Sequence, residues 1–217
     1  MKRIKQKCLS QFTLVTVTAI AFVSCDRANF SSNTPKMVSP SVTNNSELKV
    51  ADVLPHRTFL ISANGMGPIK LGMSIDEAKK AFPDAKFERT SDGDGAALID
   101  VLLGKDSVMS LYADEDDPGK PINWSKKISV IESFSPTCVN DVGIRVGTLV
   151  LDAEKVYGKT KSIIKSEIES REYIEFQKHP KHLTFRIDYT GIYPDDSRET
   201  TQFNPQAKIY SIAISSH

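Results

Sequence analysis

Two short segments of the chain space their apolar residues as the buried face of a helix requires. The first stripe is formed by Ile75, Ala78 and Phe82, and the second by Val150, Ala153 and Tyr157. Ser74 and Glu77 have the spacing of a capping box at the start of the first segment, and Pro83 ends it. Gly158 follows the second stripe, where helices often end in a left-handed residue. The pattern predicts two short helices.

Eight further segments are strand-like, four after each predicted helix. They comprise residues 85–90, 97–103, 107–113 and 127–134, and then residues 160–168, 171–177, 183–189 and 207–214. The alternation is clearest where Leu183, Phe185 and Ile187 share one face of a strand. Short polar connections at residues 91–95 and 178–182 are typical of hairpins and predict an antiparallel sheet. The predicted fold class is therefore α+β, with the helices on one face of the sheet.

An internal repeat extends this pattern. Residues 69–83 align without gaps with residues 144–158, which lie 75 positions further on. The identical pairs are Ile69 and Ile144, Gly72 and Gly147, Ala78 and Ala153, and Lys80 and Lys155. We interpret the chain as a tandem duplication, with repeat 1 over residues 53–136 and repeat 2 over residues 137–217. Each repeat is predicted to be one helix followed by four strands.

The N-terminal segment has the composition of a secretory signal peptide. Four basic residues lie within residues 2–7, and an apolar run of about 12 residues follows at 12–23, too short to span a bilayer. We therefore expect residues 1–24 to be a signal peptide and the protein to be exported.

The end of that run predicts a lipid anchor. Val23-Ser24-Cys25 resembles the lipobox of bacterial lipoproteins, in which the cysteine thiol receives diacylglycerol. The alternative is cleavage after Ala19-Ile20-Ala21, an A-x-A site, which releases a soluble periplasmic protein. We expect Cys25 to be lipidated and the protein to face the periplasm from a bacterial membrane, either inner or outer.

A polar tether separates Cys25 from the first periodic segment. Of the 18 residues from 29 to 46, 13 are Ser, Asn, Thr or Pro, a composition that buries too little surface to fold. Residues 25–52 are therefore predicted to be flexible. The other cysteines are Cys8, within the signal peptide, and Cys138. Cys138 has no intrachain partner if Cys25 is acylated, and the two could pair if the A-x-A site is used.

Charge and motifs exclude several function classes. Without residues 1–24 the chain has 24 Lys and Arg against 27 Asp and Glu, which makes nucleic acid an unsuitable partner. We find no G-x-S-x-G, H-E-x-x-H, C-x-x-C or Walker motif, so we predict no catalytic residue and no cofactor. His179 and His182 could hold zinc with Glu175 or Glu199, but a polar turn explains them better. The acidic tips at residues 92–94 and 114–117 lack the spacing of a calcium loop, so no metal site is predicted.

The helix start resembles two known families. Leu71-Gly72-Met73-Ser74-Ile75-Asp76-Glu77-Ala78 is similar to the GM[ST]xxE start in small lipoproteins that accompany the β-barrel assembly machine. Two such units in tandem resemble the β-lactamase inhibitor protein family. That resemblance implies two helix-plus-four-strand repeats whose sheets join into a saddle. Members of that family carry a disulfide in each repeat, which this chain cannot form, so no inhibitory contact and no target is carried over.

The open face of the sheet is the predicted binding surface. Alternation in the second repeat places Tyr173, Glu175, Arg186 and Asp188 opposite the helix-covered side. Aromatic and arginine side chains on rigid strands are typical of protein interfaces. We expect a protein-binding module of the inhibitor, immunity or assembly-accessory type, with an envelope protein as partner. The alternatives are a small-ligand or metal-binding periplasmic protein and a hydrolase that uses His179 or His182.

Overall fold

The computed structural model describes residues 57–93, 95–113, 117–167 and 171–215. The predicted signal peptide, Cys25 and the tether lie outside the described residues. No helix within the described ranges is long and apolar enough to cross a bilayer.

Two helices form where the apolar stripes predicted them. Helix α1 is Ile75–Ala81 and helix α2 is Val150–Tyr157. Ser74 caps α1, because the Glu77 N–H donates to Ser74 Oγ at 3.1 Å and the Ser74 N–H donates to Glu77 Oε2 at 2.6 Å. Helix α2 begins after Leu149 without a side-chain cap and ends at Gly158, whose φ is 80°. The capping box and the glycine stop are thus both present.

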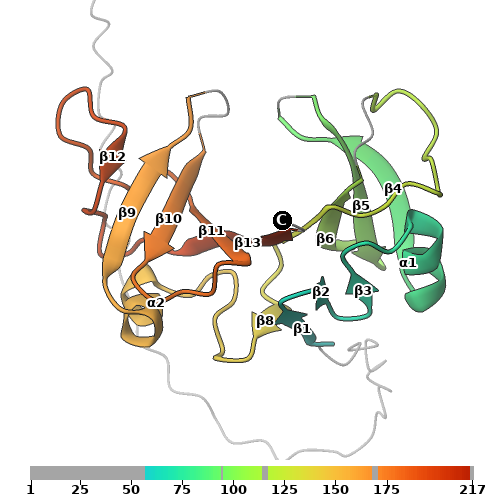
Figure 1. The fold of residues 1–217 in the computed structure, drawn as a ribbon, viewed down its shortest axis with the longest axis horizontal. Coiled ribbons are helices and arrows are strands. Elements are labelled where there is room, and N and C mark those ends of the chain that lie inside the picture. The colour runs from blue at the N-terminus through green and yellow to red at the C-terminus, as the bar shows by residue number, and fades with distance from the viewer. Residues whose placement is uncertain (1–56, 94, 114–116, 168–170, 216–217) are drawn as a thin grey trace, which may run out of the picture. The chain divides into compact units, whose positions relative to one another are not determined.

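The eight predicted strands pair in one antiparallel sheet of nine, here called the large sheet (Figure 1). Its order is β12-β9-β10-β11-β13-β7-β6-β5-β4. The first half contributes β4 (Lys86–Ser91), β5 (Ala97–Leu103), β6 (Asp106–Tyr112) and β7 (Val130–Ser133). The second half contributes β9 (Thr160–Lys165), β10 (Glu172–Phe176), β11 (Leu183–Ile187), β12 (Glu199–Thr200) and β13 (Ile209–Ser215). The predicted and observed strand ends differ by at most three residues, and β12 was not predicted.

A second sheet of four short strands corrects the prediction of a single sheet. This small sheet has the order β3-β2-β1-β8. Its strands are β1 (Phe59–Ser62), β2 (Gly65–Met66), β3 (Ile69–Lys70) and β8 (Cys138–Asn140), and β1 and β8 are parallel. Strands of two to four residues are too short to show alternation in the sequence. The antiparallel description therefore holds only for the large sheet.

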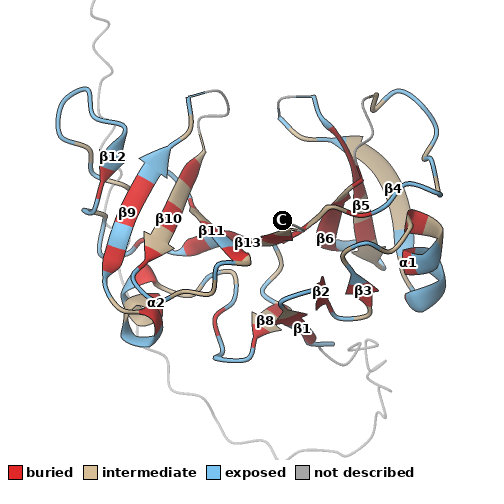
Figure 2. Ribbon diagram, viewed as in Figure 1, coloured by how far each residue is buried: buried red, intermediate tan, exposed pale blue. Residues whose placement is uncertain are grey.

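The helices and the small sheet lie on the same side of the large sheet (Figure 1). Ile75 and Ala78 of α1 and Val150 and Ala153 of α2 are buried in the common core. Figure 2 shows buried positions concentrated in β5, β6, β11, β13 and the small sheet. The opposite side of the large sheet has no helix over it in the described part of the chain, and we call it the open face.

Cys138 is buried in the small sheet as a free thiol. Burial raises the pKa of the thiol above its ordinary value, which keeps it protonated and unreactive. Its Sγ lies 3.6 Å from the Val108 carbonyl oxygen, which accepts its weak hydrogen bond. Cys138 therefore belongs to the core.

Candidate functional site

Residues that are polar, apart from one alanine, lie in register across the open face. Thr184, Ala213, Glu132, Ser110, Asp100 and Glu88 are successive cross-strand partners on β11, β13, β7, β6, β5 and β4. Directly opposed residues of antiparallel strands project to the same face, so this row runs across both halves of the sheet. The residues between them, such as Ile131, Leu111 and Ile99, are buried on the helix side. The alternation thus separates a polar surface from an apolar core.

A hollow of about 570 Å³ lies over this row. Its aromatic lining is Tyr112, Phe134, Tyr189 and Tyr210, and its charged lining is Asp92, Asp100, Arg171 and Arg186. A smaller hollow of about 230 Å³ shares Tyr112, Arg171 and Arg186 with it and adds Glu132 and Tyr173. The two hollows together form the candidate site, and both halves of the chain contribute to it.

A buried ion pair lies on its floor. Arg186 Nη1 donates to Glu132 Oε1 at 3.0 Å, and Ser211 Oγ donates to the same oxygen at 2.5 Å. The Arg186 and Glu132 side chains are only 15% and 7% exposed. The Arg186 guanidinium also lies 5.8 Å from the Phe134 ring centroid and 5.4 Å from that of Tyr210. The pair joins β11 to β7 through hydrogen bonds and ring contacts.

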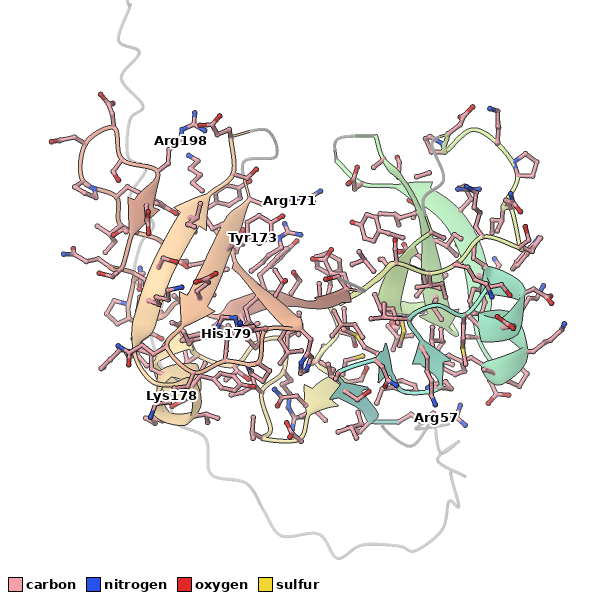
Figure 3. The ribbon with its side chains drawn as sticks, viewed as in Figure 1. Arg57, Arg171, Tyr173, Lys178, His179 and Arg198 are labelled. Carbon is pink, nitrogen blue, oxygen red and sulfur yellow. The ribbon has the colours of Figure 1, made fainter. Side chains whose placement is uncertain are left out.

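A second ion pair links the two halves at the rim. Arg171 Nη2 lies 3.1 Å from Asp92 Oδ2, and these side chains are 15% and 10% exposed. Figure 3 shows Arg171 extending from the start of β10 towards the first half. Asp92 is held in its turn because the Ala96 N–H donates to its Oδ1 at 2.8 Å. The connection between β4 and β5 is thereby tied to the start of β10.

Tyr112 is close enough to both ion pairs for their charges to act on it. Burial, followed by the negative charge of Glu132, raises its pKa to about 12. The phenol therefore stays neutral at physiological pH, and Tyr112 lines both hollows.

Of the four predicted binding residues, two line the candidate site and two do not. Tyr173 and Arg186 are direct cross-strand partners, and both line the smaller hollow. Glu175 shares their face of β10 but is paired with Lys161, whose Nζ lies 2.7 Å from Glu175 Oε2, and this bond lowers the Glu175 pKa. Asp188 follows the end of β11 and is exposed. Neither Glu175 nor Asp188 lines the two hollows.

The first half supplies residues that the sequence analysis did not select. Asp100 interrupts the apolar run of β5, and Glu132 does the same in β7. A polar residue within such a run is a signal that could have identified both. Phe134 and Tyr210 are 41% and 43% exposed, but their meeting at 5.5 Å depends on the pairing of β7 with β13.

The candidate histidine site has a structural role. His179 Nδ1 accepts a hydrogen bond from the Phe176 N–H at 3.0 Å, and its ring packs edge-on against Phe176 and Phe185. His179 therefore closes the turn after β10 instead of pointing into either hollow. Within the described ranges, no group of three His, Cys, Asp or Glu residues is placed to hold a metal ion.

No protein-family model and no curated protein matches the chain. Among solved structures, the uncharacterized protein YfeY from Escherichia coli is similar, with a TM-score of 0.49 and 16% identity. The match covers 72% of this chain and 99% of that one. A similarity of this size identifies neither a site nor an activity.

Proposed function

We propose that the protein is a binding module of the cell envelope that docks a segment of a partner protein in the hollow of its open face. The observation that carries this proposal is the lining itself. Phe134, Tyr189 and Tyr210 are 41%, 64% and 43% exposed around a hollow that Arg171 and Arg186 also line. Aromatic and arginine side chains dominate the binding energy of protein interfaces, because they bury a large area with few rotatable bonds.

Rigid strands support this role. Tyr210 lies on β13 and Tyr112 on β6, both within the continuous hydrogen-bonded ladder of the large sheet. A binding group on a strand loses little conformational entropy when it is covered, which favours affinity. Tyr189, with φ of 48°, is held in a left-handed turn next to this ladder.

A small ligand is the second candidate, favoured by the volume of the hollow. At about 570 Å³ it falls within the range of small-molecule sites. Such sites are mostly enclosed and apolar, whereas this one has a charged floor and exposed rings on its lining. A protein segment therefore fits the lining better.

Site-specific photocrosslinking tests the proposal. We expect a photoreactive phenylalanine analogue at Tyr210 or Tyr189 to give a discrete protein adduct in intact cells. The matched control is the same analogue at Leu151 or Val156, which are 41% and 44% exposed on α2, a helix on the other side of the sheet. Adducts at the α2 positions alone, or a purified protein that carries a bound small molecule, would contradict docking in the hollow.

Lipid anchoring and the tandem duplication are part of the same proposal. The basic start, apolar run and Val23-Ser24-Cys25 support export and acylation, and the ungapped match of residues 69–83 with 144–158 supports the duplication. We expect Cys25→Ala to move the protein from the membrane fraction to the soluble periplasmic fraction or to stall the precursor. A wild-type protein that is soluble and begins at Phe22 would instead show cleavage at the A-x-A site.

A further inference from the structure

Three carboxylates occur in the polar row of the open face. Glu88 lies directly opposite Asp100, and Ser110 separates Asp100 from Glu132 in register. Like charges in directly opposed positions repel each other, so a nearby cation stabilises each carboxylate, whereas a neutral donor leaves its charge in place. We therefore asked which of the three carboxylates forms an ion pair within the protein.

Two of the three have a cation. Lys86 pairs with Glu88, and Arg186 pairs with Glu132. Asp100 accepts only the hydrogen bond from Ser110 Oγ, at 2.6 Å, and no cation of the described residues forms an ion pair with it. Asp100 is also half-buried, so solvent screens its charge less than that of an exposed carboxylate.

The charged residues that line the two hollows also leave Asp100 without a cation. Their lining holds three carboxylates, Asp92, Asp100 and Glu132, and two guanidiniums, Arg171 and Arg186. Each guanidinium is already paired, with Asp92 and Glu132 respectively. The uncompensated negative charge is that of Asp100.

Arg186 shows how the hollow holds a cation. Its guanidinium lies against the Phe134 and Tyr210 rings while it binds a carboxylate at 3.0 Å. Asp100 borders the larger hollow together with those two rings and Tyr112. Asp100 and aromatic rings therefore border one hollow that a cation from outside can enter.

We propose that the hollow accepts a lysine or arginine side chain of the partner protein, whose cation pairs with Asp100 beside the aromatic rings. The inference rests on the proposed function and adds the chemistry of the partner, a basic loop. It follows from charge complementarity, because a cation is the one group that neutralises Asp100 without displacing the existing ion pairs.

Titration of the full-length chain with short peptides tests this inference. The probe is a capped Gly-Ser-Gly-Arg-Gly-Ser peptide, and its matched control carries citrulline, which has nearly the shape of arginine without the charge. We expect the arginine peptide to shift the NMR signals of Tyr112 and Tyr210 and to bind about tenfold more tightly than the citrulline peptide. Equal affinities of the two peptides would overturn the proposal.

A substitution then assigns the preference to Asp100. We expect Asp100→Asn to abolish the preference for arginine over citrulline, whereas Asp106→Asn, at the exposed start of β6 in the same hairpin, retains it. A preference that survives in folded Asp100→Asn would overturn the proposal. If that variant does not fold, the salt dependence of peptide binding to the wild-type protein is the test.

Raising NaCl from about 0.05 to about 0.5 M must lower the affinity for the arginine peptide more than the affinity for the citrulline peptide. An equal loss of affinity for both peptides would contradict the proposal.

The outcome is separable from that of the docking proposal. Crosslinking through Tyr210 combined with equal binding of the two peptides refutes only the basic character of the partner. Crosslinking confined to α2 refutes docking in the hollow itself.

Discussion

At the scale of single residues, the contacts of Arg186 decide how the open face can be probed. Its ion pair with Glu132 is almost fully buried, and its Nε is buried without a hydrogen-bond partner. A residue in this position stabilises the sheet as well as shaping the hollow. Its removal therefore alters folding and binding together, whereas Tyr189, which is 64% exposed, is the better probe of binding.

We predict that Arg186→Ala destabilises the protein by about 3–5 kcal/mol, because Glu132 is left buried without its cation. Chemical denaturation followed by circular dichroism measures the loss. The double variant Arg186→Met with Glu132→Gln should recover much of it, since no charge then remains buried. An unchanged denaturation midpoint for Arg186→Ala would show that the pair contributes nothing to stability.

Two glycines before the helices give a second residue-level prediction. Gly72 and Gly147 have φ of 78° and 87°, and a methyl group added to either would meet no atom within 4 Å. The cost of Gly→Ala at each is therefore purely conformational, about 1–2 kcal/mol. Gly93 is the matched control, because it also has open space around it but no positive φ. Comparable losses at all three positions would contradict this explanation.

At the scale of elements, the start of α1 is held by a capping box and an ion pair. Glu77 receives the Ser74 N–H and also pairs with Lys127 Nζ at 3.1 Å, which joins the helix to the segment before β7. Helix α2 has no such arrangement, because Leu149 offers no side-chain acceptor. The two helix starts should therefore respond differently to acid.

We predict that acid loosens α1 before α2. The Ser74 N–H, followed by Lys127, lowers the Glu77 pKa from 4.5 to about 2. A lowered folded-state pKa stabilises the protein above the ordinary value of 4.5, and this contribution is lost as the pH falls towards 2. The hydrogen-exchange protection factors of the Ser74 and Glu77 amides, corrected for the intrinsic exchange rate at each pH, should fall over that range, and Glu77→Gln should remove the dependence. Amides at the start of α2 serve as the control, and an equal loss of protection there would contradict the prediction.

At the scale of the whole molecule, the large sheet was predictable and the small sheet was not. Alternation over five residues identified strands such as β10 and β11. The parallel pairing of β1 with β8 joins segments nearly 80 residues apart, and nothing local in either segment indicates it. A pairing of this kind is determined by the tertiary structure that surrounds it.

Only the part of the candidate site that the second half contributes was predictable from the sequence. Alternation placed Tyr173 and Arg186 on one face, where they are cross-strand partners. Their neighbours Glu132 and Ser110 come from the first half, and their position depends on the register of β7 against β13. Register across two halves is not encoded in the alternation of either one, so the hollow could not be assembled from the sequence pattern.

We predict that the rim ion pair couples the two halves. In a double-mutant cycle of Asp92→Ala and Arg171→Ala, the coupling free energy should be about 0.5–3 kcal/mol, because both side chains are largely buried. Asp92→Ala should cost more than Arg171→Ala, since it also removes the acceptor for the Ala96 N–H. Denaturation of the four proteins gives the coupling, and strictly additive effects would show that the rim contact is incidental.

The place of β13 in the large sheet has a consequence for the order of synthesis. The ribosome makes β13 after every other strand of the sheet, yet β13 lies between β11 and β7 and is the strand that joins the two halves. Until residue 209 has been translated, β11 and β7 each keep an unpaired edge, and the polar row of the open face is split in two. A prematurely terminated chain therefore exposes two unpaired sheet edges and lacks the hollow. We expect such a chain to be degraded by proteases, and not to bind the partner with reduced affinity.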